Sequence, residues 1–284
     1  MPLDLEARQN IVYQKSFVAY LDILGFKNLV LKRTRRNKEK LERYFGIINS
    51  VIEYIRTIPL KQEISSIVIS DSIILSLSQS ENKDDNLFKL RQLLIAVGLI
   101  QKNLALKDIW LRGAITSGDT YFDASKGQVV GPAYINAFLL EQNLAISPRV
   151  IVDTRMINEF GFRSAADFTG HINDYDNDSN VSGGVNYSNW GTTILFNWNY
   201  PDGKPVNHID NDIPLFIDYL SPVIENDNNE LLTIINNLEN SIYKDSNIYK
   251  KFRWVVDYLK SLELREQKND HIICSEASYY LKNL

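Results

Sequence analysis

Residues 17–26 have the sequence FVAYLDILGF, an apolar run that ends at Asp22 and is followed closely by Gly25. An unbroken run of aliphatic and aromatic residues is typical of a buried strand, because it leaves no polar face for solvent. We therefore predict a buried strand over residues 16–22 that presents a carboxylate at its end. The segments on either side of it decide what this strand pairs with.

The next 130 or so residues alternate between helical and strand patterns. They predict a helix over 38–57, strands over 64–70 and 72–77 that flank Asp71, a helix over 87–106, a strand over 109–117, a helix over 133–144 that Gly131 and Pro132 open, and a strand over 150–152. Strand, helix, strand pair, helix, strand is the order of the ferredoxin-like, split βαβ fold. We expect an α+β protein with an antiparallel sheet and helices packed on one face.

The second half of the chain changes character twice. Asn, Asp, Gly and Ser dominate residues 164–212, which predicts an irregular polar insertion at the surface. Apolar runs over 192–198 and 214–220 predict two more strands, and residues 230–242 and 248–262 predict helices. We expect one domain over residues 1–220, and a helical extension over 221–284 that packs on the core or at a dimer interface.

Composition excludes several classes of protein. Of 284 residues 44% are apolar and 23% are charged, as in an ordinary globular protein, and the net charge of −4 argues against a nucleic-acid-binding protein. The basic run over residues 32–40 is interpreted as a solvated loop leading into a helix, although a phosphate or partner surface is the alternative.

Cysteine and leader patterns indicate a compartment. Cys274 is the single cysteine, so no intrachain disulfide forms, and the first residues lack the apolar core of a signal peptide. The most apolar stretch, over residues 93–106, falls short of the ~20 residues that a membrane span needs. We expect a cytoplasmic protein without a membrane partner.

Asp22 and Asp71 are the main chemical signal. In a split βαβ sheet the first strand neighbours the hairpin that contains Asp71, so both carboxylates meet at one edge. Paired hard oxygen ligands suit Mg²⁺ or Mn²⁺, which typically bridge substrate phosphates, and Gly25 permits a turn whose backbone N–H groups face a phosphate. The alternative is that Asp71 is only the bend of the hairpin. The pair of acids together with the glycine favours a metal site.

Four segments resemble, in order, the motifs of the class III nucleotidyl cyclases. They are residues 17–26, Ile69-Ser70-Asp71-Ser72, Leu111–Gly118 (LRGAITSG) and Val130–Ala137 (VGPAYINA). The chain is more similar still to the pyrimidine cyclases of the Pycsar antiphage systems. That resemblance rests on Arg112–Ile115, Gly131–Ala133 with Leu140-Glu141, Pro148–Asp153 and the tail Phe252–Tyr258.

The resemblance implies an activity and a set of site residues. A class III enzyme closes the ribose 3′-hydroxyl of a nucleoside triphosphate onto the α-phosphorus and releases pyrophosphate. It implies two Mn²⁺ or Mg²⁺ ions per site at Asp22 and Asp71 with Ile23, a phosphate-binding backbone at Ile23, Leu24, Gly25 and Phe26, and a ribose-orienting role for Asn136. It also implies a homodimer with two symmetric sites and, for the antiphage subgroup, a product that acts as a second messenger in defence.

Two departures from the family pattern bear on substrate and catalysis. Ile67 and Gln128 stand where adenine-specific enzymes carry a base-reading lysine and aspartate, so a neutral pocket for uracil or cytosine is expected. Leu140 stands where the family places a transition-state arginine, for which Arg112, Lys27 and Arg149 are candidate replacements.

Two other readings stay open. A purine or diguanylate-type cyclase is the first, although the Gly-Gly pair of the diguanylate hairpin is missing around Asp71. A nucleotide-binding sensor that has lost catalysis is the second, favoured by Leu140 and opposed by the presence of both aspartates.

Overall fold

The computed structural model describes residues 8–57, 64–173, 193–196, 215–226, 228–243, 246–268 and 274–284. The predicted sheet lies at its centre. Its first four strands are β1 (Gln14–Ile23), β2 (Ser65–Ile69), β3 (Ser72–Ser78) and β4 (Leu111–Asp123), and they lie in the order β2-β3-β1-β4. All three pairings are antiparallel. This is the strand order of the split βαβ fold, so the predicted α+β class is confirmed.

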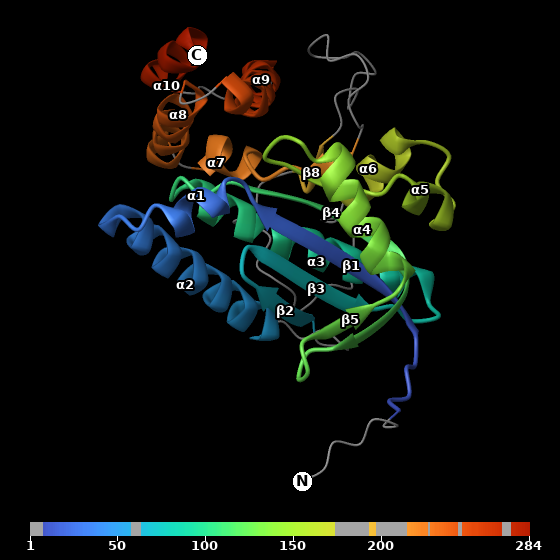
Figure 1. Cartoon of the computed structure of the whole chain (residues 1–284). Coiled ribbons are helices and arrows are strands. Elements are labelled where there is room, and N and C mark those ends of the chain that lie inside the picture. The colour runs from blue at the N-terminus through green and yellow to red at the C-terminus, as the bar shows by residue number, and fades with distance from the viewer. Residues whose placement is uncertain are drawn as a thin grey trace.

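Helices cover both faces of this sheet, which corrects the expectation of a single covered face. Helices α2 (Arg35–Thr57) and α3 (Lys83–Ala105) share one apolar cluster with Phe17, Ala19 and Leu21 of β1. Helix α4 (Pro132–Leu144) packs on the opposite face against Val18 and Tyr20. Figure 1 shows α4 crossing in front of the sheet with α3 behind it. The apolar run of β1 is unbroken because both of its faces are buried.

Gly131 fixes where α4 begins. Its φ is +146°, and a Cβ at this position would lie 2.4 Å from the carbonyl oxygen of Asp119. Only glycine fits so close to strand β4 in this conformation. Pro132 follows at the first helical position, where its missing N–H is no loss. Sequence and structure agree on this helix to within one residue.

Further strands extend the sheet beyond the split βαβ core. Strand β4 continues past the predicted Ser117 because its last residues pair with β5 (Gln128–Val130). Strand β6 (Val150–Val152) lies parallel to β4, so the sheet is mixed rather than purely antiparallel. Within the described residues, the two expected late strands contain β7 (Leu195–Phe196) and β8 (Phe216–Ile217).

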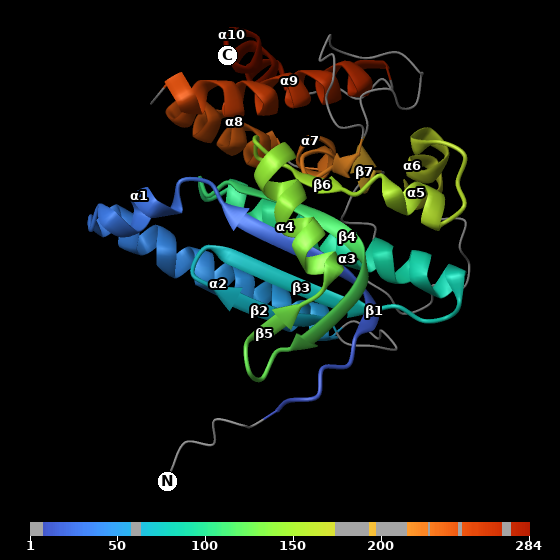
Figure 2. The same ribbon diagram turned by 45° about the vertical axis from the view of Figure 1, so that its right-hand side comes forward.

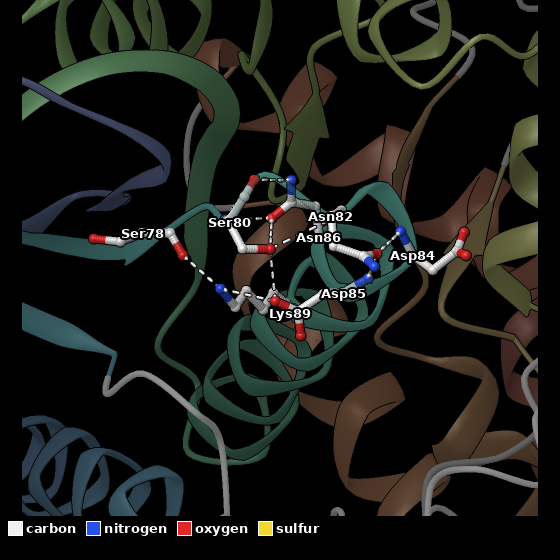
Figure 3. A network of polar contacts seen from close by, with 7 residues as sticks. All are labelled: Ser78, Ser80, Asn82, Asp84, Asp85, Asn86 and Lys89. Atoms are coloured by element: carbon white, nitrogen blue, oxygen red, sulfur yellow. Dashed lines mark hydrogen bonds and ion pairs between the residues drawn. The ribbon is translucent and has the colours of Figure 1, made fainter.

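A polar network fixes the start of α3 (Figure 3). The Oδ1 of Asn82 accepts from the backbone N–H groups of Asp84 at 2.8 Å and Asp85 at 3.0 Å, and so caps the helix. One turn further on, the buried Lys89 donates to the carbonyl oxygen of Ser78 at 3.2 Å and pairs with Asp85 at 3.3 Å. The buried ammonium is therefore neutralised and ties β3 to the helix that follows it.

The C-terminal residues form a helical layer over one end of the sheet (Figure 2). It consists of α7 (Ser221–Asn226), α8 (Asn228–Ile242), α9 (Ser246–Lys268) and α10 (Ser275–Asn283). Apolar residues of α8, α9 and α10 belong to the same buried cluster as strands β1 and β4. The helices therefore share the core of the sheet.

A buried carboxylate joins strand β8 to this layer. Asp218 is fully buried and accepts from the Oγ of Ser221 at 2.6 Å and from its backbone N–H at 3.0 Å. The hydroxyls of Thr193 and Tyr258 donate to it as well. A buried charge that is hydrogen-bonded in this way holds α7 and α9 against the sheet end.

The expected irregular insertion begins with regular structure. Helix α5 (Arg155–Glu159) precedes it, and Ala165–Asn173 forms helix α6, in which Phe168 and Ile172 are buried. Those two apolar side chains, one turn apart, reach the core and stabilise the helix. Residues 174–192 and 197–214 lie outside the described residues. Within the described ranges no helix has the length and apolarity that crossing a bilayer requires.

Candidate active site

Asp22 and Asp71 lie side by side at one end of the sheet. Asp22 pairs in register with Ser72 of β3 on one side and with Arg112 of β4 on the other. The backbone N–H of Ile23 donates to the carbonyl oxygen of Asp71 at 3.3 Å. The hairpin turn reaches this point because Ser70 adopts a positive φ of 58°. The two acids predicted to meet at one edge are thus brought together.

Arg112 is the cation at this pair. Its Nε and Nη2 donate to Oδ2 of Asp22 at 3.2 and 3.1 Å, and its Nε lies 2.8 Å from Oε1 of Glu141 on α4. Glu141 is 2% exposed, whereas the Asp22 and Arg112 side chains are 17% and 23% exposed. One guanidinium therefore links two carboxylates that come from different elements.

Burial and like charges raise the pKa values of both acids. Burial raises the pKa of Asp22, the charge and hydrogen bonds of Arg112 lower it, and Asp71 raises it. Burial raises the pKa of Glu141 to about 7, although Arg112 opposes the shift. Asp22 and Glu141 share a single guanidinium, and the charge of Asp71 raises the pKa of Asp22, so an added cation would be favoured beside the two aspartates.

Two tyrosines close the inner side of the site. The Tyr44 hydroxyl donates to the carbonyl oxygen of Ser70 at 3.3 Å, and burial together with the charges of Asp71 and Asp22 raises its pKa. The Tyr20 hydroxyl lies 2.9 Å from the Oγ of Ser72. Both phenols therefore stay protonated next to the carboxylates.

The turn after Asp22 has the shape that its glycine predicts. Gly25 has a φ of 78°, and a Cβ there would meet nothing within 4 Å, so backbone conformation is the reason for glycine at this position. Leu24 donates its N–H to the carbonyl oxygen of Trp110 at 2.8 Å, while the ring of Phe26 packs against Tyr44. Ile23 is buried and Gly25 is exposed.

Other predicted residues lie apart from the carboxylates. Asn136 is half-buried on α4, and within the described residues it makes no hydrogen bond to Asp22, Asp71 or Arg112. Of the replacement cations, Arg149 is buried with its guanidinium over the ring of Trp254 at 5.0 Å. Arg112 is therefore the candidate that contacts an aspartate of the site.

The two predicted base-reading residues lie on the same side of the sheet as α4. Ile67 is 5% exposed and pairs in register with Ile74. Ile74 lines a pocket of about 540 Å³ together with the exposed Gln128 of β5, Ile69 and Tyr134. This volume falls in the range of small-molecule sites. Gln128 thus lines the pocket itself, whereas Ile67 lies on the neighbouring strand, beside the pocket residue Ile74.

Glu141 and Lys251 were not predicted as site residues. Glu141 follows Ala133 and Ala137 at helical spacing on the face of α4 that packs on the sheet. A charged residue at the end of a small, buried face is the sequence signal that would have revealed it. Lys251 on α9 lowers the pKa values of both Asp22 and Glu141 by its charge. No local pattern indicates this residue, because Lys251 lies more than 200 positions after Asp22 in the sequence.

The oxygen donors at this point fit a divalent cation. The carboxylates of Asp22 and Asp71 and the carbonyl group of Ile23 are hard ligands of the kind that Mg²⁺ and Mn²⁺ prefer. No cluster of three or more His, Cys, Asp or Glu side chains with metal-binding geometry occurs among the described residues.

The chain resembles several solved cyclase structures at low similarity. No family model and no curated protein matches the sequence. The adenylyl cyclase CyaB from P. aeruginosa has a TM-score of 0.38 and 12% identity over 53% of this chain and 82% of its own. The guanylyl cyclase Cya2 has a TM-score of 0.37 and 13% identity over 56% of this chain and 84% of its own. A class III adenylyl cyclase-like ATP-binding protein from Pseudomonas aeruginosa has a TM-score of 0.36 and 13% identity over 50% and 34%. At these values the roles of the site residues depend on this chain's own geometry.

Proposed function

We propose that this protein is a nucleotide cyclase that converts UTP or CTP to the 3′,5′-cyclic monophosphate and pyrophosphate. The observation that carries the proposal is the meeting of Asp22, Asp71 and Arg112 at the end of a split βαβ sheet. This arrangement joins a pair of metal-binding carboxylates to a cation, within a chain whose motifs resemble the class III cyclases. A product that acts as a second messenger in antiphage defence is the role that the Pycsar resemblance adds.

The reaction forms one bond and breaks one. The ribose 3′-oxygen bonds to the α-phosphorus, and the bond from that phosphorus to the oxygen bridging to the β-phosphate breaks, which releases pyrophosphate. Two Mn²⁺ or Mg²⁺ ions, when bound, supply charge neutralisation for the triphosphate and lower the pKa of the hydroxyl. Asp22 and Asp71 would hold the cations, with Ile23 beside them. The N–H groups of Ile23 and Leu24 already donate to the carbonyl oxygens of Asp71 and Trp110, so Gly25 and Phe26 are the residues of this turn whose N–H groups would face the phosphates.

Arg112 would change its main partner if Asp22 bound a cation. Its Nε lies within ion-pair distance of Glu141, at 2.8 Å, and Oε1 of Glu141 has no hydrogen-bond partner among the described residues, so Glu141 would accept the donor that Asp22 releases. In that position the guanidinium does the work of the family's transition-state arginine, which is Leu140 in this chain. Asn136 orients the ribose from the second subunit of a homodimer, which accounts for its distance from Asp22.

The pocket beside Gln128 supports a pyrimidine. Its walls are apolar or neutral, with Ile69, Ile74 and Tyr134 around the Gln128 amide. An amide both donates and accepts hydrogen bonds, as the Watson–Crick edges of uracil and cytosine require. Ile67 leaves no charged group to read a purine. These features favour UTP and CTP over ATP and GTP.

Exposed apolar side chains on α4 and the strands beside it support the dimer. Ile135 and Leu139 are 47% and 45% exposed one turn apart, and Ile69 of β2 is 55% exposed. Such side chains on one face mark an interaction surface. In a symmetric dimer this surface would meet its own copy and bring each Asn136 towards the other subunit's Asp22.

The proposal is tested by incubating the protein with each of the four nucleoside triphosphates and Mn²⁺, and identifying products by mass spectrometry. We expect cyclic UMP or cyclic CMP with an equal amount of pyrophosphate, and much less product from ATP and GTP. The absence of a cyclic product with all four nucleotides contradicts the enzyme.

One observation favours a second candidate, a nucleotide-binding sensor without turnover. Arg112 occupies the carboxylate of Asp22, and Leu140 replaces the family's arginine. This candidate predicts tight nucleotide binding that Asp71→Ala leaves unchanged and no turnover, as measured by equilibrium dialysis and product analysis.

A further inference from the structure

We propose that Lys251, on the C-terminal helix α9, binds the β- and γ-phosphates of the nucleotide at the Asp22–Asp71 site. This rests on the proposed function and adds a residue from outside the split βαβ core. It gives the helical layer a direct part in substrate binding, within the same subunit as the two aspartates.

Packing brings the start of α9 to the site. Phe252, the residue after Lys251, contacts the ring of Trp110 edge-on with ring centroids 5.2 Å apart. The carbonyl oxygen of Trp110 accepts from the N–H of Leu24 at 2.8 Å, in the turn that follows Asp22. Both rings are buried, with Phe252 6% and Trp110 4% exposed. The turn and the helix are thus held against one tryptophan.

The charge of Lys251 reaches the carboxylates. It lowers the pKa values of both Asp22 and Glu141, which come from β1 and α4. Its neighbour Arg253 is committed elsewhere, to Asp257 at 3.0 Å and to the carbonyl oxygen of Leu284 at 2.8 Å. Lys251 itself forms no ion pair or hydrogen bond with the side chain of another described residue. Its ammonium is therefore available to an anion at the site.

The charge balance of the site calls for such a cation. Asp22 and Glu141 share one guanidinium, that of Arg112, and Asp71 adds a further negative charge next to Asp22. A nucleoside triphosphate brings about four more negative charges, which the divalent ions only partly neutralise. A lysine on a flexible stem is a common phosphate ligand because its three donors adapt to moving oxygens. Lys251 is half-buried, so its side chain loses less water on binding than an exposed lysine would.

The test compares Lys251→Met with Lys250→Met, since Lys250 is the exposed neighbour on the same helix. The ligands are 3′-deoxy-UTP, which lacks the attacking hydroxyl, inorganic pyrophosphate and UMP, each with Mn²⁺ and followed by calorimetry. For Lys251→Met we expect 3′-deoxy-UTP and pyrophosphate to bind at least about 10-fold more weakly, with UMP binding unchanged. In the cyclase assay KM should rise by a similar factor while kcat changes little.

Two controls show whether the substitutions damage the fold: the conservative variant Lys251→Arg and the unfolding midpoint of each variant. We expect Lys251→Arg to recover most of the 3′-deoxy-UTP affinity, and all three variants to unfold within a few degrees of the wild type. Equal affinities of Lys251→Met and Lys250→Met for 3′-deoxy-UTP overturn the inference, even if the wild type cyclises UTP. If Lys251→Met weakens the binding of 3′-deoxy-UTP and pyrophosphate but not of UMP, the inference is supported, even if the wild type forms no cyclic product. The phosphate-binding role of Lys251 and the cyclase activity can therefore fail independently.

Discussion

Arg112 is shared between two carboxylates that enter the site on different elements. Asp22 is the acid whose oxygens a divalent cation needs, and Glu141 is the acid buried deeply enough to keep the guanidinium in place. Arg112 would therefore keep a carboxylate partner if it left Asp22, and a buried charge without a partner would be costly. In the proposed site this sharing would let Asp22 exchange its ion pair for a divalent cation.

At the residue scale, Asp71→Asn should reduce kcat/KM for cyclisation at least about 100-fold, because it removes one of the two charged metal ligands. Asp71 is half-buried in a hairpin turn and lies outside the apolar core, so the unfolding midpoint should change little. Asp119→Asn, an exposed acid on β4, is the matched control and should keep full activity. A steady-state assay with UTP and Mn²⁺ measures both, and equal activity of the two variants would show that Asp71 has no catalytic part.

Glu141 makes stability depend on pH. Burial raises its pKa from 4.5 to about 7, so between these values the folded state keeps a proton that the unfolded state releases. This contribution to the free energy of unfolding is complete below pH 4.5 and is lost as the pH rises through about 7. Glu141→Gln cannot lose a proton, so its free energy of unfolding does not fall over this pH range. Its stability relative to wild type should therefore increase from pH 5 to pH 8 by on the order of 1 kcal/mol.

Urea unfolding at pH 5 and pH 8 measures this difference. Glu53→Gln, an exposed acid on α2, is the control and should track the wild type at both pH values. If Glu141→Gln also tracks the wild type at both, Glu141 has an ordinary pKa in the folded protein.

At the scale of elements, local pattern was enough for the central sheet. The apolar runs around Asp22 and Asp71 predicted β1, β2 and β3 to within two residues, because buried strands bounded by turns have a clear sequence signature. Gly131 and Pro132 located the start of α4 for the same reason. The expectation that all helices cover one face of the sheet was wrong, because α4 packs on the opposite face. Val18 and Tyr20 would be apolar whichever helix covered them, so the sequence of β1 does not tell which face α4 takes.

The residues of the candidate site also divide into those that a local pattern indicated and those that depend on tertiary packing. Asp22, Asp71 and Arg112 were predicted because each lies at a strand end or in a recognisable motif. Glu141 and Lys251 were missed as site residues because their proximity depends on how α4 and α9 dock on the sheet, which is a long-range property. The helix over residues 165–173 was missed because its polar residues outnumber the two that reach the core.

The docking of α9 depends on a buried hydroxyl. Tyr258 is fully buried and donates to Asp218, which has no solvent to replace a lost donor. Tyr258→Phe should lower the free energy of unfolding by about 1–3 kcal/mol, because it leaves a buried carboxylate with one hydrogen bond fewer. Denaturant unfolding followed by circular dichroism measures the effect. Tyr279→Phe changes an exposed tyrosine of α10 and should have no effect, so equal stability of the two variants would contradict the role given to Asp218.

At the scale of the whole molecule, the proposed site needs two copies of the chain. Substituting Ile135 and Leu139 together by Asp places carboxylates on the exposed face of α4, where a symmetric dimer would bury them. We expect the dimer to dissociate, with a Kd raised at least about 100-fold, and cyclase activity to be lost.

Sedimentation velocity gives the oligomeric state, and circular dichroism gives the fold of the same sample. Tyr279→Asp alters an equally exposed side chain on α10 and should stay dimeric and active. A wild type that is monomeric and still active would remove the need for a shared site.

The most direct measurement offers the protein all four nucleoside triphosphates at equal concentration in one reaction with Mn²⁺, and quantifies every cyclic product by mass spectrometry beside the Asp22→Asn variant. We predict that the wild type forms cyclic UMP or cyclic CMP in large excess over cyclic AMP and cyclic GMP, and that Asp22→Asn forms none. A predominance of a cyclic purine would refute the base preference assigned to Gln128 and Ile67, and cyclic product from Asp22→Asn at the wild-type rate would contradict the carboxylate pair as the catalytic centre.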